Sequence, residues 1–170
     1  MSAPSSTPVP ALTLIPENPQ DAATIEALLH RAFGPGRFTK VSERVREIAD
    51  FAPELSFCAW QDGRLAGTVR QWRVAVGDQP LIFLGPLAVD HDQRSAGVGG
   101  LLVARACEAA EAAGEAGVLL VGDEPYFARM GFSAAPAAQV VLPRPVDQRR
   151  VLLRAFRPLA LFGDVGPRRA

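Results

Sequence analysis

Three glycines fall within four positions of this chain, at Gly97, Gly99 and Gly100. They stand between an apolar segment, 81–89, that is typical of a buried strand, and a segment from about Val98 whose small and apolar residues repeat with helical spacing. Each glycine within a helix costs about 1 kcal/mol relative to alanine, so helix propensity does not explain them. The N–H groups of a first helical turn attract anions, and glycine lets a ligand approach the backbone. This strand–loop–helix junction is therefore predicted to bind a phosphate.

Two common nucleotide loops do not fit this junction. The G-x-x-x-x-G-K-[ST] pattern is absent because Lys40 is the only lysine, and the loop has no G-x-G-x-x-G. The residues Arg94-Ser95-Ala96-Gly97-Val98-Gly99 instead fit Gln/Arg-x-x-Gly-x-Gly/Ala. This pattern resembles the coenzyme-A pyrophosphate loop of the GNAT superfamily of N-acetyltransferases. The alternative is a glycine-rich turn that binds no ligand.

A second motif extends the resemblance. The apolar segment 117–122 is typical of a buried strand, and it continues into GD-x-P-Y-F-x-R-x-GF, ending at Phe132. Together with LGPLAV at 84–89, this resembles the YhbS-like subgroup of predicted acetyltransferases. The resemblance implies an α/β fold with a mixed, mostly antiparallel sheet of about seven strands and helices on both faces. The sheet would splay between the 81–89 and 117–122 strands.

The Gly85-Pro86 pair interrupts the first of these strands. Proline removes a ladder donor and glycine often marks a bulge, so the strand is predicted to bend here or to be an ordinary irregular edge. In the family, the pantetheine arm of acetyl-CoA lies in such a gap like an added strand. The resemblance thus implies acetyl-CoA as co-substrate, with no metal. The implied cofactor-binding residues are Leu87, Ala88, Val89, Arg94, Ser95, Ala96, Gly97, Val98, Gly99, Gly100 and Phe127.

The catalytic residues are less well defined. By resemblance, many GNAT enzymes carry a tyrosine at the position of Phe127, where it protonates the leaving thiolate. Tyr126 is the only tyrosine, but successive helix residues are rotated by about 100°, so Tyr126 either reaches the sulfur or packs the turn. Asp123 is a candidate general base or a cap of the following short helix. Glu17, His91 and Asp92 are weaker candidates for the base.

Composition limits the remaining possibilities. Basic and acidic side chains balance at 18 each, and no basic stripe indicates a nucleic-acid partner. We find no signal peptide and no apolar run long enough for a membrane span, and the scattered Cys58 and Cys107 suit a reducing cytoplasm. We expect a tail at 1–10 that is disordered, a single domain at 11–158 and a C-terminal tail at 159–170. By resemblance, the helices predicted near 19–33 and 42–48 border the acceptor site.

These observations predict an acetyl-CoA-dependent N-acetyltransferase whose acceptor is an amine of a small molecule or peptide. Many relatives dimerise, and the sequence leaves the oligomeric state open. Two alternatives stay open as well. One is an acyl-CoA-binding or regulatory module that has lost catalysis. The other is an interaction domain in which the glycines serve only helix–sheet packing.

Overall fold

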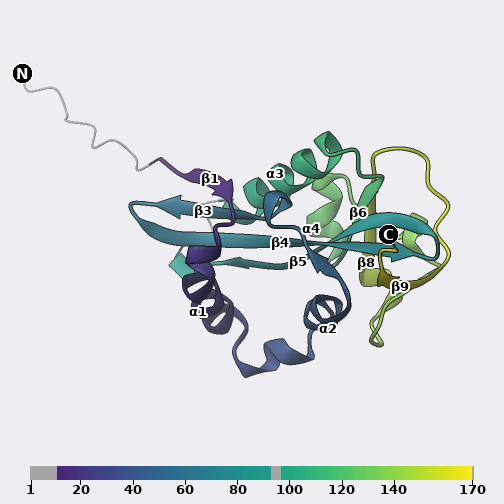
Figure 1. Ribbon diagram of the computed structural model, residues 1–170, viewed down its shortest axis with the longest axis horizontal. Coiled ribbons are helices and arrows are strands. Elements are labelled where there is room, and N and C mark those ends of the chain that lie inside the picture. Colours follow the sequence, from purple (N-terminus) through teal and green to yellow (C-terminus); the bar gives the residue numbers. More distant parts are fainter. Residues whose placement is uncertain (1–10, 93–96, 170) are drawn as a thin grey trace, which may run out of the picture.

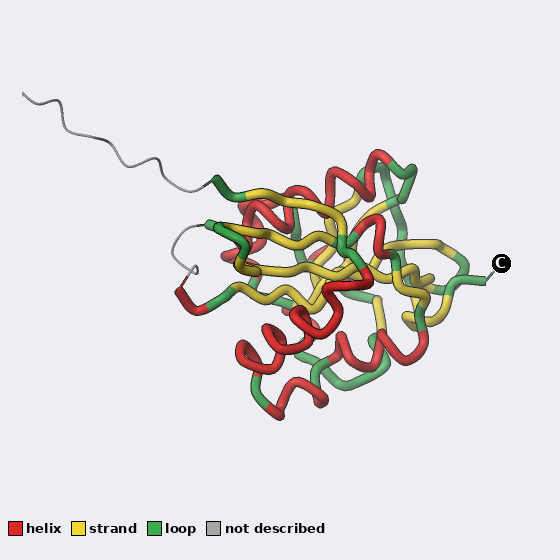
Figure 2. Tube along the Cα trace, turned by 60° about the vertical axis from the view of Figure 1, so that its left-hand side comes forward, coloured by secondary structure: helices red, strands yellow, loops and turns green. Residues whose placement is uncertain are grey.

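The computed structural model describes residues 11–92 and 97–169 and has a mixed sheet with helices on both faces (Figures 1 and 2). The helices are α1 Ala22–Phe33, α2 Val41–Ile48, α3 Val98–Ala112 and α4 Glu124–Phe127. The strands are β1 Thr13–Pro16, β2 Asp50–Phe51, β3 Phe57–Gln61, β4 Arg64–Val76, β5 Gln79–Val89, β6 Gly117–Val121, β7 Val140–Val141, β8 Val151–Ala155 and β9 Gly163–Pro167.

The sheet follows the order β1-β3-β4-β5-β6-β8, with β2 and β9 paired to β4 and β7 paired to β9. Most pairs are antiparallel, while β5–β6 and β7–β9 are parallel. Figure 1 shows α3 on one side of the sheet and α1 and α2 on the other. This arrangement confirms the predicted fold class.

Each face of the sheet is covered by the apolar side of a helix. On α1, the residues Ile25, Leu28 and Leu29 are buried with Cys58 of β3 and Ala88 of β5. Buried residues of α3 lie in the main core with those of β3 to β6, and the α3 residues are Val98, Leu102, Val103, Ala106, Cys107 and Ala110. Alternate residues of one strand therefore meet different helices, as the two-residue period of a strand requires.

Two predictions about the sheet need correction. Within the described residues the sheet has nine strands, more than the expected seven or so, because β2 and β9 were not predicted. The segment 159–170 is not a tail outside the domain, because β9 pairs with β4 at Val74, Ala75 and Val76. The sequence of β9, Gly-Asp-Val-Gly-Pro, has low strand propensity, so the open edge of β4 rather than local preference makes it a strand. The predicted tail at 1–10 lies outside the described residues.

The strands β5 and β6 diverge as the sequence predicted. They pair only at Ile82–Val118 and Phe83–Leu119, after which β5 continues along β4 and β6 continues along β8. The β4–β5 register shifts by one residue at Gly85-Pro86, which lie opposite Arg70. This bulge bends β5 away from β6 and opens the gap that the site occupies.

Candidate active site

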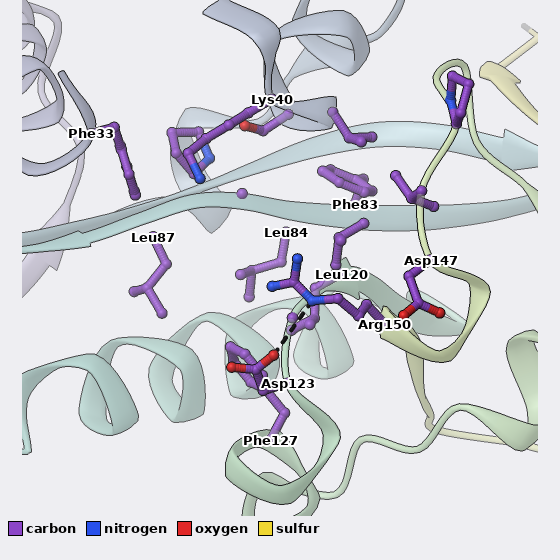
Figure 3. A pocket seen from close by; sticks show the side chains of 18 residues that line it. Phe33, Lys40, Phe83, Leu84, Leu87, Leu120, Asp123, Phe127, Asp147 and Arg150 are labelled. Carbon is purple, nitrogen blue, oxygen red and sulfur yellow. Dashed lines mark ion pairs between the residues drawn. The ribbon is translucent and has the colours of Figure 1, made fainter. Parts of the chain in front are cut away.

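A cavity of about 470 Å³ lies where β5 and β6 separate (Figure 3). Its walls come from the bulge and following residues of β5, the end of β6, the start of α2 and the loop before β8. The lining residues labelled in Figure 3 are Phe33, Lys40, Phe83, Leu84, Leu87, Leu120, Asp123, Phe127, Asp147 and Arg150. The walls are mainly apolar, with charged groups at two ends.

A tryptophan holds the bulge in place. The indole Nε1 of Trp72 donates a hydrogen bond of 2.6 Å to the carbonyl of Gly85, and the Trp72 side chain is buried. Gly85 has φ of 150°, a value that favours glycine. From the sequence, Trp72 is either a core residue or part of the acceptor pocket, with core favoured; it is buried in the core and positions the bulge.

A second cavity, of about 430 Å³, lies beside the first at the start of α3. Both cavities are lined by Phe33 and Leu87, and the second is also lined by Val89, Gly97 and Gly99. The β5 backbone forms one of its walls. The N–H of Asp90 donates to Ala66 of β4, so by strand alternation the N–H groups of Leu87 and Val89 point away from β4, toward the gap.

The glycine turn has the backbone that an anion site requires. Gly97 precedes α3 in the left-handed conformation, with φ of 74°. A Cβ on Gly99 would lie 3.2 Å from the hydroxyl of Tyr126, whereas a Cβ on Gly100 would meet no atom within 4 Å. The side chain of Val98 is buried in the core, so only its backbone faces a ligand. The predicted residues Arg94, Ser95 and Ala96 lie outside the described residues.

The remaining predicted cofactor contacts lie on β5 and α4. Leu87, Ala88 and Val89 all line the 430 Å³ cavity; Leu87 and Val89 are partly buried, and the side chain of Ala88 is buried with residues of α1. Phe127 lines the 470 Å³ cavity and packs so tightly on Gly122 that any Cβ at Gly122 would overlap its ring. Glycine is therefore required at the end of β6.

Tyr126 and Phe127 face different cavities. Their rings are 4.8 Å apart and nearly perpendicular, with an interplanar angle of 85°. Tyr126 lines the 430 Å³ cavity, and its hydroxyl lies over Gly99, while Phe127 lines the 470 Å³ cavity. This is the divergence expected of neighbouring residues in a helical turn.

Asp123 lies at the rim of the 470 Å³ cavity. It occupies the N-cap position of α4 but makes no side-chain cap hydrogen bond; its carboxylate instead pairs with Arg150 at 3.4 Å (Figure 3). The Asp123 side chain is 76% exposed. Arg150, Lys40 and Asp147 also line this cavity, and none of them was predicted from the sequence. Asp147 and Arg150 come from the segment before β8 and Lys40 from the segment before α2, and no spacing pattern links the two segments.

A buried ion network lies beneath α1 and α2. Arg70 of β4 donates to both carboxylate oxygens of Glu17, at 3.1 and 2.9 Å, and to Glu26 of α1 at 3.0 Å. Glu26 also accepts hydrogen bonds from Arg37 and Arg46. The side chain of Glu17 is thus held in a buried ion pair and lines neither cavity. Glu17 is therefore not placed to act as the general base.

This network sets the charge of Glu26. Burial by itself would raise the pKa of Glu26, but the hydrogen bonds from the three arginines outweigh burial and lower the pKa from 4.5 to about 2.

The pKa values of the two cysteines shift upward. Cys58 and Cys107 are buried, and burial raises the pKa of each thiol to about 11. Neither thiol is therefore activated as a nucleophile.

Other site types are not found in the described part of the chain. Across residues 11–92 and 97–169, no group of three or more His, Cys, Asp or Glu side chains is placed to hold a metal ion. Within the same residues, no helix combines the length and apolar character needed to cross a membrane.

Comparisons with known proteins agree with this geometry. The model of the acetyltransferase (GNAT) family matches residues 22–132. The uncharacterized N-acetyltransferase YhbS of Escherichia coli K12 is 34% identical over 122 residues, covering 70% of this chain and 72% of YhbS. The crystal structure of E. coli YhbS in complex with CoA has a TM-score of 0.78 at 26% identity, covering 96% of this chain and 93% of YhbS. The crystal structure of a Brucella melitensis GNAT acetyltransferase in complex with acetyl-CoA has a TM-score of 0.70 at 26% identity, covering 92% of this chain and 95% of the Brucella protein.

Proposed function

Because this chain belongs to the GNAT family of acetyltransferases, we propose that it transfers the acetyl group of acetyl-CoA to a primary amine. The acceptor is a small molecule or an exposed amino group, and both substrates are bound together. The observation that carries the proposal is the adjacency of the glycine turn before α3 to the unpaired end of β5. The two cysteines, buried and unpaired, support a reducing cytoplasmic setting.

The backbone supplies most of the proposed acetyl-CoA site. The free N–H groups at the start of α3 bind the pyrophosphate, helped by the helix dipole. The pantetheine arm pairs with the side of β5 that β6 leaves open, through Leu87 and Val89. Their N–H groups also point where an oxyanion would form, and stabilising that charge is the largest contribution expected of the protein.

The proposed reaction is direct attack of the amine on the thioester. Asp123 takes one proton from the ammonium ion, and the neutral nitrogen then forms the C–N bond. The C–S bond breaks with its electron pair on sulfur, and the nitrogen gives up its second proton to solvent, from which the Tyr126 phenol is restored after it has protonated the thiolate. Tyr126 donates its proton to the thiolate, because it is the one ionisable side chain among the described residues that line the 430 Å³ cavity. The products are the amide and CoA.

Calorimetric titration of acetyl-CoA tests the cofactor site. Gly100→Glu places a negative charge at the proposed pyrophosphate site, where there is open space for a Cβ atom. Ala112→Glu is the matched control, because it adds the same charge at the exposed far end of α3, about 18 Å away. We expect micromolar binding by the wild type and Ala112→Glu, and a loss of at least about tenfold in Gly100→Glu. Equal affinities in all three proteins would refute the site.

A second candidate function is favoured by one residue. Phe127 has no proton to donate at the position where the family resemblance implies a tyrosine, which favours an acyl-CoA-binding module without turnover. Turnover on a panel of primary amines separates the two functions. Tight acetyl-CoA binding without acetylation of any amine would establish the module.

A further inference from the structure

Within the described residues, the ion pairs around the 470 Å³ cavity leave one of its lining cations without a carboxylate partner. Asp147 is held by Arg149, at 3.1 Å to Nε and 2.8 Å to a terminal nitrogen, and Arg149 does not line this cavity. Asp123 pairs with Arg150. Lys40 forms no ion pair with any carboxylate in the described ranges; its ammonium lies over the ring of Phe33, 4.5 Å from the centroid. Among the described residues that line the cavity, Lys40 is therefore the cation whose charge has no ion-pair partner.

The position of this charge matters as much as its sign. Figure 3 shows Lys40 at one end of the cavity and Asp123 at the opposite end. Apolar side chains line the cavity, those of Phe83, Leu84, Leu87, Leu120 and Phe127, and the guanidinium of Arg150 lies between Lys40 and Asp123 in this view. A ligand spanning the cavity thus meets the ammonium group of Lys40 at one end, apolar walls along its length and the Asp123–Arg150 ion pair at the other end.

We infer that the acetyl acceptor is a primary amine with an apolar body and a carboxylate, the chemistry of apolar amino acids, and that Lys40 binds that carboxylate. The inference rests on the proposed acetyltransferase function. It places the acceptor amine near Asp123. Lys40 is a compact point charge with three N–H donors, which can pair with a carboxylate.

The test compares two pairs of amines that differ only in the carboxylate. These are L-phenylalanine with 2-phenylethylamine, and L-leucine with 3-methylbutylamine. In Lys40→Met, we expect KM for the amino acids to rise by about tenfold, while kcat and the KM for acetyl-CoA stay the same. The two decarboxylated amines should be unaffected. Comparing variants on the same amine cancels the difference in basicity between the members of a pair.

Two further variants complete the design. Lys40→Arg keeps the charge and should retain most of the preference for the carboxylated amines. Arg44→Met removes a positive charge from the exposed face of α2, outside the cavity, and should change nothing. Circular dichroism and thermal unfolding confirm that each variant folds.

The outcomes separate this inference from the proposed function. If the wild type acetylates the decarboxylated amines as well as the amino acids, or if Lys40→Met weakens both alike, the inference is wrong and the acetyltransferase function stands. If no amine is acetylated although acetyl-CoA binds, the inference fails and the CoA-binding module remains. If acetyl-CoA does not bind either, both proposals fail.

Discussion

Tyr126 and Phe127 are neighbours in the chain, yet their side chains serve different parts of the site. The hydroxyl of Tyr126 lies over Gly99 at the start of α3, on the side where the coenzyme is proposed to run. The ring of Phe127 forms part of the apolar wall of the other cavity and packs against Gly122. Two adjacent residues thus supply a proton donor on one side and an apolar wall on the other.

Replacing Tyr126 by Phe tests the proposed proton donor. We expect Tyr126→Phe to lower kcat by about 100-fold, near the low end of the range of rate effects for general acid catalysis. The effect is small because a thiolate whose thiol has a pKa of about 8.5 can leave without being protonated first. The KM for acetyl-CoA should change little. Steady-state kinetics across pH is the measurement. A higher KM with unchanged kcat would instead assign Tyr126 to coenzyme binding.

Asp123 is tested by replacing its carboxylate with an amide. We expect Asp123→Asn to lower kcat/KM by about 100-fold at neutral pH, where the acceptor is an ammonium ion that must lose a proton. The deficit should shrink at high pH, since more amine is then neutral without help. Asp147→Asn is the control, because Asp147 lines the same cavity but is held by Arg149. A deficit that is constant across pH would assign Asp123 a structural role through Arg150.

At the scale of elements, Arg70 connects α1 and the segment before it to the sheet. The side chains of Arg70 and Glu17 are only 6% and 5% exposed, so their charges depend on each other. Arg70→Met leaves the Glu17 carboxylate buried without a partner, and we expect it to lower the free energy of unfolding by about 3–5 kcal/mol. Urea denaturation measures this loss. Arg44→Met, which breaks an exposed pair with Glu47, should cost less than about 1 kcal/mol.

The same network predicts how stability depends on pH. The pKa of Glu26 is about 2 in the folded protein, below the 4.5 of an unperturbed glutamate, so the unfolded chain binds more protons between these values. The contribution of Glu26 is therefore complete above pH 4.5 and is lost as pH falls from 4.5 toward 2. Glu26→Gln should be less stable than the wild type at neutral pH, and the difference should narrow below pH 4.5. A difference that does not change with pH would contradict the assignment.

At the scale of the whole molecule, the C-terminal segment completes the sheet. Leu161 and Val165 are buried, and Arg168 pairs with Glu115 at 3.0 and 2.8 Å. Deleting 159–170 uncovers the edge of β4 and removes these contacts. We expect a loss of about 3–6 kcal/mol, from two buried aliphatic side chains alone. Thermal unfolding measures it, and deleting only the last two residues should have no effect. If the truncated protein unfolds at the same temperature as the full chain, the domain ends at 158 as the sequence predicted.

Much of the site could be predicted because it depends on local sequence. The strand at 81–89, the Gly85-Pro86 bulge and a helix from Val98 all follow from hydrophobic period and turn chemistry, which nearby residues determine. The strand β9 could not be predicted. Its glycines and proline oppose a strand, and only the unpaired edge of β4 overrides that preference.

By itself, the sequence determined the family, the glycine turn that opens α3 and the divergence of Tyr126 from Phe127. Only the tertiary structure decided which charges share a cavity. Lys40 precedes α2, Asp123 follows β6 and Arg150 precedes β8, and no periodicity relates them. They meet because the bulge in β5 separates two strands and the flanking elements close around the gap. Whether Lys40 has a partner is likewise set by packing, since pairing depends on distances in space rather than on spacing in the chain.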